Sequence, residues 1–244
     1  DAGLDRMNSA IEEFGRAIKR GGVALVFYAG HGMQVNGENY LIPIDADLKK
    51  ETDIQSKTLK LGLILTKLED AKSQVNVVVL DACRDNPFAR SWRSAGKGGL
   101  ASIDAPTGTV IAFATAPGKT AADGSGANGL FTTHFLRQLR IPNQKLEDVL
   151  KNTRKGVAAE SQNEQIPWDS SSLTGDFYFK VSNSVMTAKA GQPPETGGAE
   201  QTTVATRSIK IDGAADKSQP DGTASDSPVG GLFNSLKGMF KPQD

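Results

Sequence analysis

Apolar side chains near the start of the chain recur at steps of three and four residues, the spacing that places them on one face of an α-helix. The residues that follow this spacing are Leu4, Met7, Ile11, Phe14 and Ile18. The pair Gly21-Gly22 ends the pattern. The next six residues, 23–28 (VALVFY), are apolar or aromatic and predict a strand that is buried on both faces.

The rest of the first 180 residues alternates between the same two patterns. Strands are predicted at 75–80 (VNVVVL), 109–115 (TVIAFAT) and 176–179 (DFYF), and helices are predicted around 61–68, 130–140 and 146–159. The segment 75–80 is the clearest strand because its side chains are β-branched and almost wholly apolar. Apolar strands separated by helices indicate an α/β domain with a mostly parallel sheet covered by helices on both faces.

The composition of the chain changes near residue 180. Residues 181–244 are rich in Gly, Pro, Ser and Thr, and their only aromatic side chains are Phe233 and Phe240. Such a segment buries too little apolar surface to offset the entropy lost on ordering. We therefore predict one domain over residues 1–180 and a disordered tail over 181–244. Within the tail, residues 229–241 have the pattern of a short amphipathic helix that could contact a partner or a membrane surface.

Charge and cysteine content exclude several classes of function. Lys and Arg number 28, and so do Asp and Glu, so the net charge is zero and a dedicated nucleic-acid binder is not expected. No apolar run approaches the ~18 residues of a transmembrane helix. One cysteine and two histidines exclude an internal disulfide and a zinc site built on paired cysteines. We expect a soluble protein without a cofactor, and a lone cysteine suits the cytoplasm and the periplasm equally.

Two residues with reactive side chains follow two of the predicted strands. His31 follows the strand at 23–28, and Cys83 follows the strand at 75–80. Ligands of open parallel sheets bind beyond the carboxyl ends of the strands, so both residues are expected at one edge. An imidazole beside a thiol can take its proton and stabilise the thiolate. The sequence therefore predicts a Cys–His nucleophilic site.

The backbone around these residues suits the same chemistry. Glycines on both sides of His31 allow a peptide to approach closely, and the N–H groups of Gly32 and Cys83 could form an oxyanion hole. Each residue taken alone has another interpretation. Cys83 fits a small buried hydrophobic residue, and His31 fits a structural or exposed loop residue.

Longer segments around both residues resemble a known family. His31 precedes Cys83 by 52 residues, close to the spacing of about 50 in caspases. The segments are YAGHGMQVNGENYLIPIDADL, VVVLDACRDNPF, GTVIAFATAPG and NEQIPWDSSSLTGDFYF. Together they resemble the bacterial caspase-like cysteine peptidases, relatives of the metacaspases, over residues 5–180. The resemblance implies a caspase-like three-layer sandwich, with Cys83 as nucleophile and His31 as general base of an endopeptidase that cleaves proteins or peptides through an acyl-enzyme.

The residue two positions before Cys83 differs from that in animal caspases. Their signature has Gln at this position, whereas this chain has Asp81. In metacaspases an acidic residue there helps line the primary specificity pocket. By that resemblance, Asp81 would select Arg or Lys before the scissile bond. The alternative is that Asp81 caps or braces its own loop.

The segment after Cys83 resembles the linker between the large and small subunits of the family. It contains three basic residues, Arg90, Arg93 and Lys97, which are candidate positions of self-cleavage. An ordinary solvated basic loop fits these residues nearly as well.

Metacaspases are often activated by calcium, a cation that binds oxygen ligands. Four acidic residues that could supply them are Asp45, Asp47, Glu51 and Asp53. Their spacing is not that of an EF-hand loop, so a solvated acidic loop is favoured and no metal ligand is assigned.

The family places two strands and a helix before the helix with which this chain opens, beside the strand that carries the histidine. Without them, a sheet edge and one wall of the pocket would be open. Two hypotheses remain from the sequence. One is an active cysteine endopeptidase, and the other is a catalytically inactive caspase-like domain that binds partner proteins.

Overall fold

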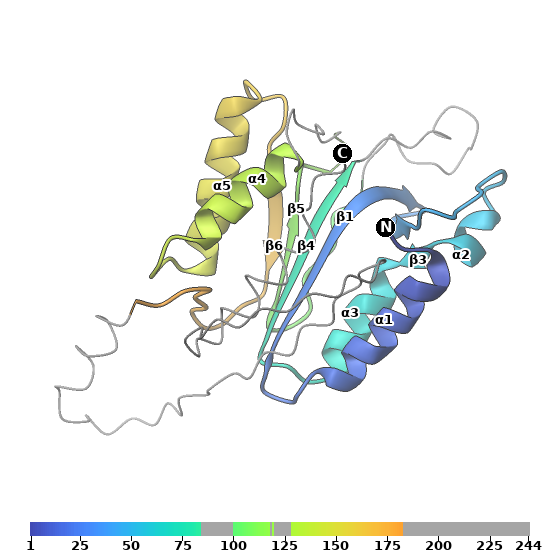
Figure 1. Ribbon diagram of the computed structural model, residues 1–244, viewed down its shortest axis with the longest axis horizontal. Coiled ribbons are helices and arrows are strands. Elements are labelled where there is room, and N and C mark those ends of the chain that lie inside the picture. The colour runs from blue at the N-terminus through green and yellow to red at the C-terminus, as the bar shows by residue number, and fades with distance from the viewer. Residues whose placement is uncertain (84–99, 118, 120–127, 183–244) are drawn as a thin grey trace, which may run out of the picture.

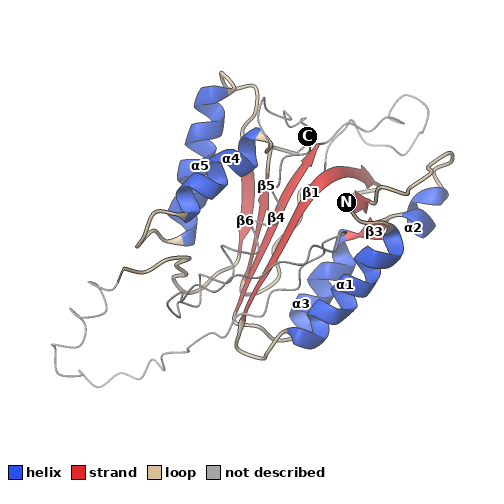
Figure 2. Cartoon of the chain, viewed as in Figure 1, coloured by secondary structure: helices blue, strands red, loops and turns tan. Residues whose placement is uncertain are grey.

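The structure is a computed structural model that describes residues 1–83, 100–117, 119 and 128–182. These residues form a six-stranded sheet with helices on both faces (Figures 1 and 2). The strands are β1 (Val23–Val35), β2 (Glu38–Ile42), β3 (Leu59–Lys60), β4 (Val75–Cys83), β5 (Thr109–Phe113) and β6 (Trp168–Ser171). The helices are α1 (Leu4–Ala17), α2 (Asp53–Lys57), α3 (Leu61–Asp70), α4 (Leu130–Leu139) and α5 (Leu146–Glu160).

The sheet is parallel at its centre and antiparallel toward both ends. The strand order is β3-β2-β1-β4-β5-β6. β1, β4 and β5 run parallel, whereas β2 and β6 run antiparallel to their inner neighbours and β3 runs antiparallel to β2. The carboxyl ends of the three parallel strands therefore meet at one edge of the sheet.

Alternating side chains of the central strand belong to the two halves of the core. Val77 and Val79 pack with residues of α4 and α5, whereas Val78 and Leu80 pack with residues of α1 and α3. All four side chains are at most 1% exposed. Burial on both faces explains why this strand is almost wholly apolar in sequence, and it confirms the α/β three-layer prediction.

The first strand is longer than its apolar run. β1 continues through residues 29–35, and a turn with positive φ at Asn36 (52°) and Gly37 (82°) leads it back into β2. The pairing of Val35 with Glu38 shows that the connection has two residues. An Asn-Gly pair is the strongest sequence signal for such a hairpin, so β2 could have been predicted from it.

The strand predicted at 176–179 is wrong. Tyr178 makes one isolated bridge with Lys145, and the last strand of the sheet is β6 instead. The apolar pattern at Phe177 and Phe179 arises because these side chains pack into the core beside the sheet. There the Phe179 ring meets Phe135 of α4 edge to face. β6 is mostly polar because it is an edge strand with half-exposed side chains, and this hides it from a search for apolar runs.

One side of β1 is open along its first half. Residues 23–30 pair with β4 on one side, and no described strand lies on the other side of them. In the part of the chain that the structure describes, this half of β1 therefore forms an edge of the sheet. None of the helices in the described ranges is long and apolar enough to span a membrane.

Candidate active site

His31 and Cys83 lie in register on neighbouring parallel strands. The paired positions of β1 and β4 run from Val23 with Val75 to His31 with Cys83. Adjacent strands are about 4.8 Å apart, so the backbones that carry the two residues are separated by one strand spacing. Both residues are inside the strands and not in the loops that follow them. Their catalytic roles stay predictions.

The environment of His31 changes sharply along β1. Ala29, Gly30 and His31 are exposed, and the next two residues, Gly32 and Met33, are buried. His31 is also the position at which β1 changes partner, because it pairs with Cys83 on β4 and with Ile42 on β2. The backbone of His31 is thus held by a strand on each side, while the residue itself is exposed to solvent.

Tyr28 contacts the backbone at this change of partner. Its hydroxyl donates toward the carbonyl oxygens of His31, at 2.7 Å, and Ile42, at 3.0 Å. Burial raises the pKa of the Tyr28 hydroxyl well above its usual range. From the sequence, Tyr28 is predicted only as part of an apolar strand. A hydroxyl at the end of such a strand, two residues before a glycine, is the signal that could have indicated its contact with the backbone.

Gly32, predicted to donate its N–H to an oxyanion, is tightly enclosed. A methyl group on it would lie 3.0 Å from Leu100 Cδ2 and 3.3 Å from Ala82 Cβ. Leu100 is itself held in place because the next residue, Ala101, exchanges two hydrogen bonds with the side chain of Asn39 on β2. The backbone of Gly32 therefore has close neighbours, and its role as a donor stays a prediction.

The carboxylate of Asp81, a residue of β4, lies near the N-terminal end of α4. It accepts a hydrogen bond from the hydroxyl of Thr132, which is in the first turn of that helix. A methyl group on Gly129, the residue before α4, would lie 2.9 Å from Asp81 Oδ2. This arrangement supports the bracing interpretation and leaves the specificity interpretation open. Thr132 was not singled out from the sequence, where it is one of several polar residues in a helical pattern.

The remaining sequence-predicted residues have other surroundings. Arg90, Arg93 and Lys97 lie outside the described residues, as does the tail from residue 183 on. Asp45 accepts a hydrogen bond from the N–H of Leu4 at the start of α1. Asp53 accepts bonds from the N–H groups of Lys49 and Lys50, and these contacts hold the pKa of its carboxyl below its usual range.

Two of these acidic residues form ion pairs. The pair of Asp47 with Lys49 is exposed, and the pair of Asp53 with Lys57 is partly buried. Among the side chains that the structure describes, no group of three or more His, Cys, Asp or Glu residues is placed to hold a metal ion. Calcium activation stays a prediction.

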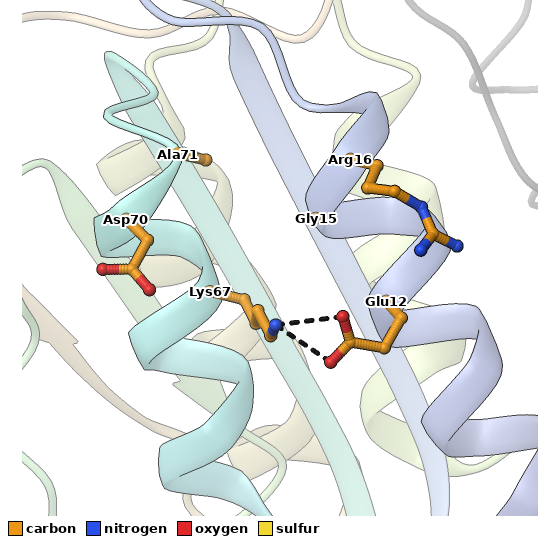
Figure 3. A pocket seen from close by; sticks show the side chains of 6 residues that line it. All are labelled: Glu12, Gly15, Arg16, Lys67, Asp70 and Ala71. Carbon is orange, nitrogen blue, oxygen red and sulfur yellow. Dashed lines mark hydrogen bonds and ion pairs between the residues drawn. The ribbon is translucent and has the colours of Figure 1, made fainter.

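A separate groove lies between α1 and α3 (Figure 3). Its lining includes Glu12 and Lys67, whose Nζ is 2.9 and 3.0 Å from the two carboxylate oxygens of Glu12. The groove follows the last turns of both helices, which lead into the starts of β1 and β4. It therefore lies toward the opposite edge of the sheet from His31 and is not the candidate active site.

Two curated mammalian proteins are similar to part of this chain. They are the human mucosa-associated lymphoid tissue lymphoma translocation protein 1 and its mouse homolog, both 29% identical over 148 residues. The match covers 59% of this chain and only 17% of each relative. Caspase-1 from Spodoptera frugiperda is similar in structure, with a TM-score of 0.49, 16% identity and 73% of each chain covered.

A family match covers most of the chain. Residues 1–178 match the model of the caspase domain, a span that includes every described helix and strand together with His31 and Cys83. The chain belongs to the caspase domain family of cysteine peptidases.

Proposed function

We propose that this protein is a cysteine endopeptidase in which Cys83 is the nucleophile and His31 is the general base. The observation that carries the proposal is the register of β1 and β4, which pairs the lone cysteine of the chain with His31 at the carboxyl edge of the sheet. Family membership supports the same chemistry. No residue other than Cys83 offers a thiol.

The reaction proceeds in two acyl-transfer steps. His31 takes the proton of the Cys83 thiol, and the thiolate forms a bond to the carbonyl carbon of the scissile peptide. The carbon–nitrogen bond then breaks, and the imidazolium gives its proton to the leaving amine. A water molecule, deprotonated by His31, hydrolyses the thioester and restores the thiol. The N–H groups of Gly32 and Cys83 would stabilise the oxyanion formed in both steps.

The substrate residue before the scissile bond is proposed to be Arg or Lys. Asp81 is two residues before the nucleophile, and an acidic side chain next to the reacting carbonyl favours a basic substrate side chain over an acidic one. The hydrogen bond from Thr132 would hold this carboxylate in one orientation. The same charge would disfavour the aspartate preference of animal caspases.

The proposal is tested with fluorogenic peptides that end in Arg, Lys or Asp, each measured with and without calcium. Cys83→Ala is the matched control, because it removes one sulfur atom and leaves the fold. We expect cleavage after Arg and Lys that disappears in Cys83→Ala. Cleavage after Asp alone would keep the nucleophile and overturn the role of Asp81. No turnover by a folded wild-type protein, with or without calcium, would overturn the peptidase and favour a partner-binding domain.

A further inference from the structure

The place where β1 changes partner is held by one side chain that the reaction itself does not use. His31 pairs with Cys83 on β4 and with Ile42 on β2, and Tyr28 lies three residues before it on the same strand. We propose that Tyr28 is a positioning residue for His31, whose backbone it fixes in register with Cys83. The inference rests on the proposed function, since it assigns Tyr28 a part in the same reaction.

The hydroxyl of Tyr28 joins the two strands beside the imidazole. It lies 2.7 Å from the His31 carbonyl oxygen and 3.0 Å from the Ile42 carbonyl oxygen, both normal hydrogen-bond lengths. His31 and Ile42 face each other in the β1–β2 pairing. A hydroxyl has one proton, so this donor is shared between the two carbonyls. One phenol therefore links the backbone of His31 to that of its partner strand.

The phenol of Tyr28 leaves room only for glycine at position 30, the residue before His31. A methyl group on Gly30 would lie 2.8 Å from the Tyr28 hydroxyl oxygen and 3.0 Å from Cζ. Real Cβ atoms do not approach an oxygen that closely, so the phenol occupies the space that any side chain at position 30 would need. The hydrogen bond to the His31 carbonyl thus depends on a glycine one residue before it.

The hydroxyl keeps its proton wherever a histidine base can work. Burial raises the pKa of Tyr28, whereas an ordinary histidine titrates near pH 6.5. Tyr28 is therefore a constant donor through the pH range of the proposed reaction. Its effect on catalysis comes from the position of the His31 backbone, since its hydroxyl contacts carbonyls and not the imidazole.

Loss of this hydroxyl should change catalysis more than folding. The two carbonyls are at most partly buried, so water can hydrogen-bond to each of them and offset much of the lost stability, but separate waters would not link the two strands as the phenol does. A general base, however, must lie within about 3 Å of the atom whose proton it takes, and a misplacement of about 1 Å can lower the rate by roughly 10²-fold.

Tyr28→Phe tests the proposal with two readouts. The first is kcat against KM for an Arg peptide. The second is the rate of Cys83 alkylation by iodoacetamide between pH 5 and pH 9, which reports a single site because the chain has one cysteine. Tyr40→Phe is the matched control, because Tyr40 is a buried tyrosine on β2, in register with Met33.

We expect kcat to fall about 10-fold or more in Tyr28→Phe, with KM changed by less than about twofold. We also expect the alkylation profile to move toward the ordinary thiol value of about 8.5, because the imidazole no longer stabilises the thiolate. Tyr40→Phe should leave both readouts as in the wild type.

The outcomes separate this inference from the proposed function. Unchanged kcat and an unchanged alkylation profile in Tyr28→Phe would overturn the role of Tyr28 and leave the peptidase standing. Failure of Tyr28→Phe to fold would also overturn it, because the hydroxyl would then serve folding and not the placement of His31. A wild-type protein without turnover and with ordinary thiol reactivity would overturn the proposed function itself.

Discussion

Thr132 in the first turn of α4 donates a hydrogen bond to the carboxylate of Asp81 near the end of β4. Thr132 is 1% exposed, so the donor side of this bond is shielded from water, whereas Asp81 is partly exposed. The positive end of a helix dipole favours a carboxylate placed near it. Asp81 therefore contributes to the attachment of α4 whether or not it also binds a substrate. Its charge and its hydrogen bond can be tested one at a time.

Asp81→Asn should abolish the preference for basic substrates. Asparagine keeps an oxygen that can accept from Thr132 but carries no charge to pair with Arg. Peptides with Arg and with citrulline, its uncharged isostere, give the sharpest comparison. The ratio of their kcat/KM values should fall by about 10²-fold in Asp81→Asn, the typical loss when a charge pair is broken.

Thr132→Val supplies the control for this experiment. It removes the donor and keeps the charge of Asp81, so much of the preference for Arg over citrulline should remain. The unfolding free energy should fall by about 1–3 kcal/mol, because a hydrogen bond to a charged, partly buried carboxylate is lost. Asp81 would be a bracing residue alone if Asp81→Asn kept the wild-type ratio and only lowered the stability.

Gly32→Ala should couple to Leu100. The added methyl group would lie 3.0 Å from Leu100 Cδ2, and Leu100 is 0% exposed and cannot turn away freely. Overpacking of this kind costs about 1–3 kcal/mol. Combining Gly32→Ala with Leu100→Ala should destabilise by less than the two single changes together, as measured by urea unfolding. Additive effects would contradict the contact.

The sequence and the structure agree best where one residue pattern has one physical cause. The run at 75–80 is apolar because β4 is buried on both faces, so strand and sheet type follow from it directly. His31 and Cys83 could be placed at one edge because parallel strands end together. The sequence did not predict that they pair directly, because that depends on the register of the two strands. The register is set by contacts along the whole of β1 and β4.

The features that the sequence did not predict depend on contacts between distant segments. The hydroxyl of Tyr28 has a role because Ile42 returns beside His31, and Thr132 has a role because α4 begins beside Asp81. β6 could not be recognised as a strand from WDSS alone, because Trp168 is 47% exposed and the segment is held by pairing with β5. Edge strands of this kind lack the alternation of apolar and polar residues by which a strand is recognised in a single sequence.

Gly156→Ala should destabilise the protein even though alanine is the better helix former. A methyl group on Gly156 of α5 would lie 2.2 Å from His134 Nδ1 on α4, and His134 is 8% exposed. The two helices must separate to admit it, at about 1–3 kcal/mol, which exceeds the gain of about 0.5–1 kcal/mol in helix propensity.

Gly15→Ala in α1 is the matched control, because here the same substitution should stabilise the protein. The nearest atom to its methyl group would be Lys67 Cδ at 3.5 Å, an ordinary contact. Here only the propensity gain remains, so the unfolding free energy should rise by about 0.5–1 kcal/mol. Urea unfolding measures the change in stability of both variants, and a stabilised Gly156→Ala would show that the His134 ring can move away from α5 to admit the methyl group.

The stability of the wild-type protein should fall relative to Tyr28→Phe above about pH 10. Burial raises the pKa of Tyr28 in the folded protein, whereas in the unfolded chain the phenol loses its proton near pH 10. Above that pH the folded state binds more protons than the unfolded state, so its stability decreases as the pH rises. The phenylalanine variant lacks this proton, so its stability has no such dependence on pH.

Urea unfolding at pH 9, 10 and 11 measures this effect. The free energy of unfolding of the wild type should fall relative to that of the variant by up to about 1.4 kcal/mol per pH unit. A difference that stays constant across this range would mean that the Tyr28 hydroxyl is as open to solvent in the folded protein as in the unfolded chain.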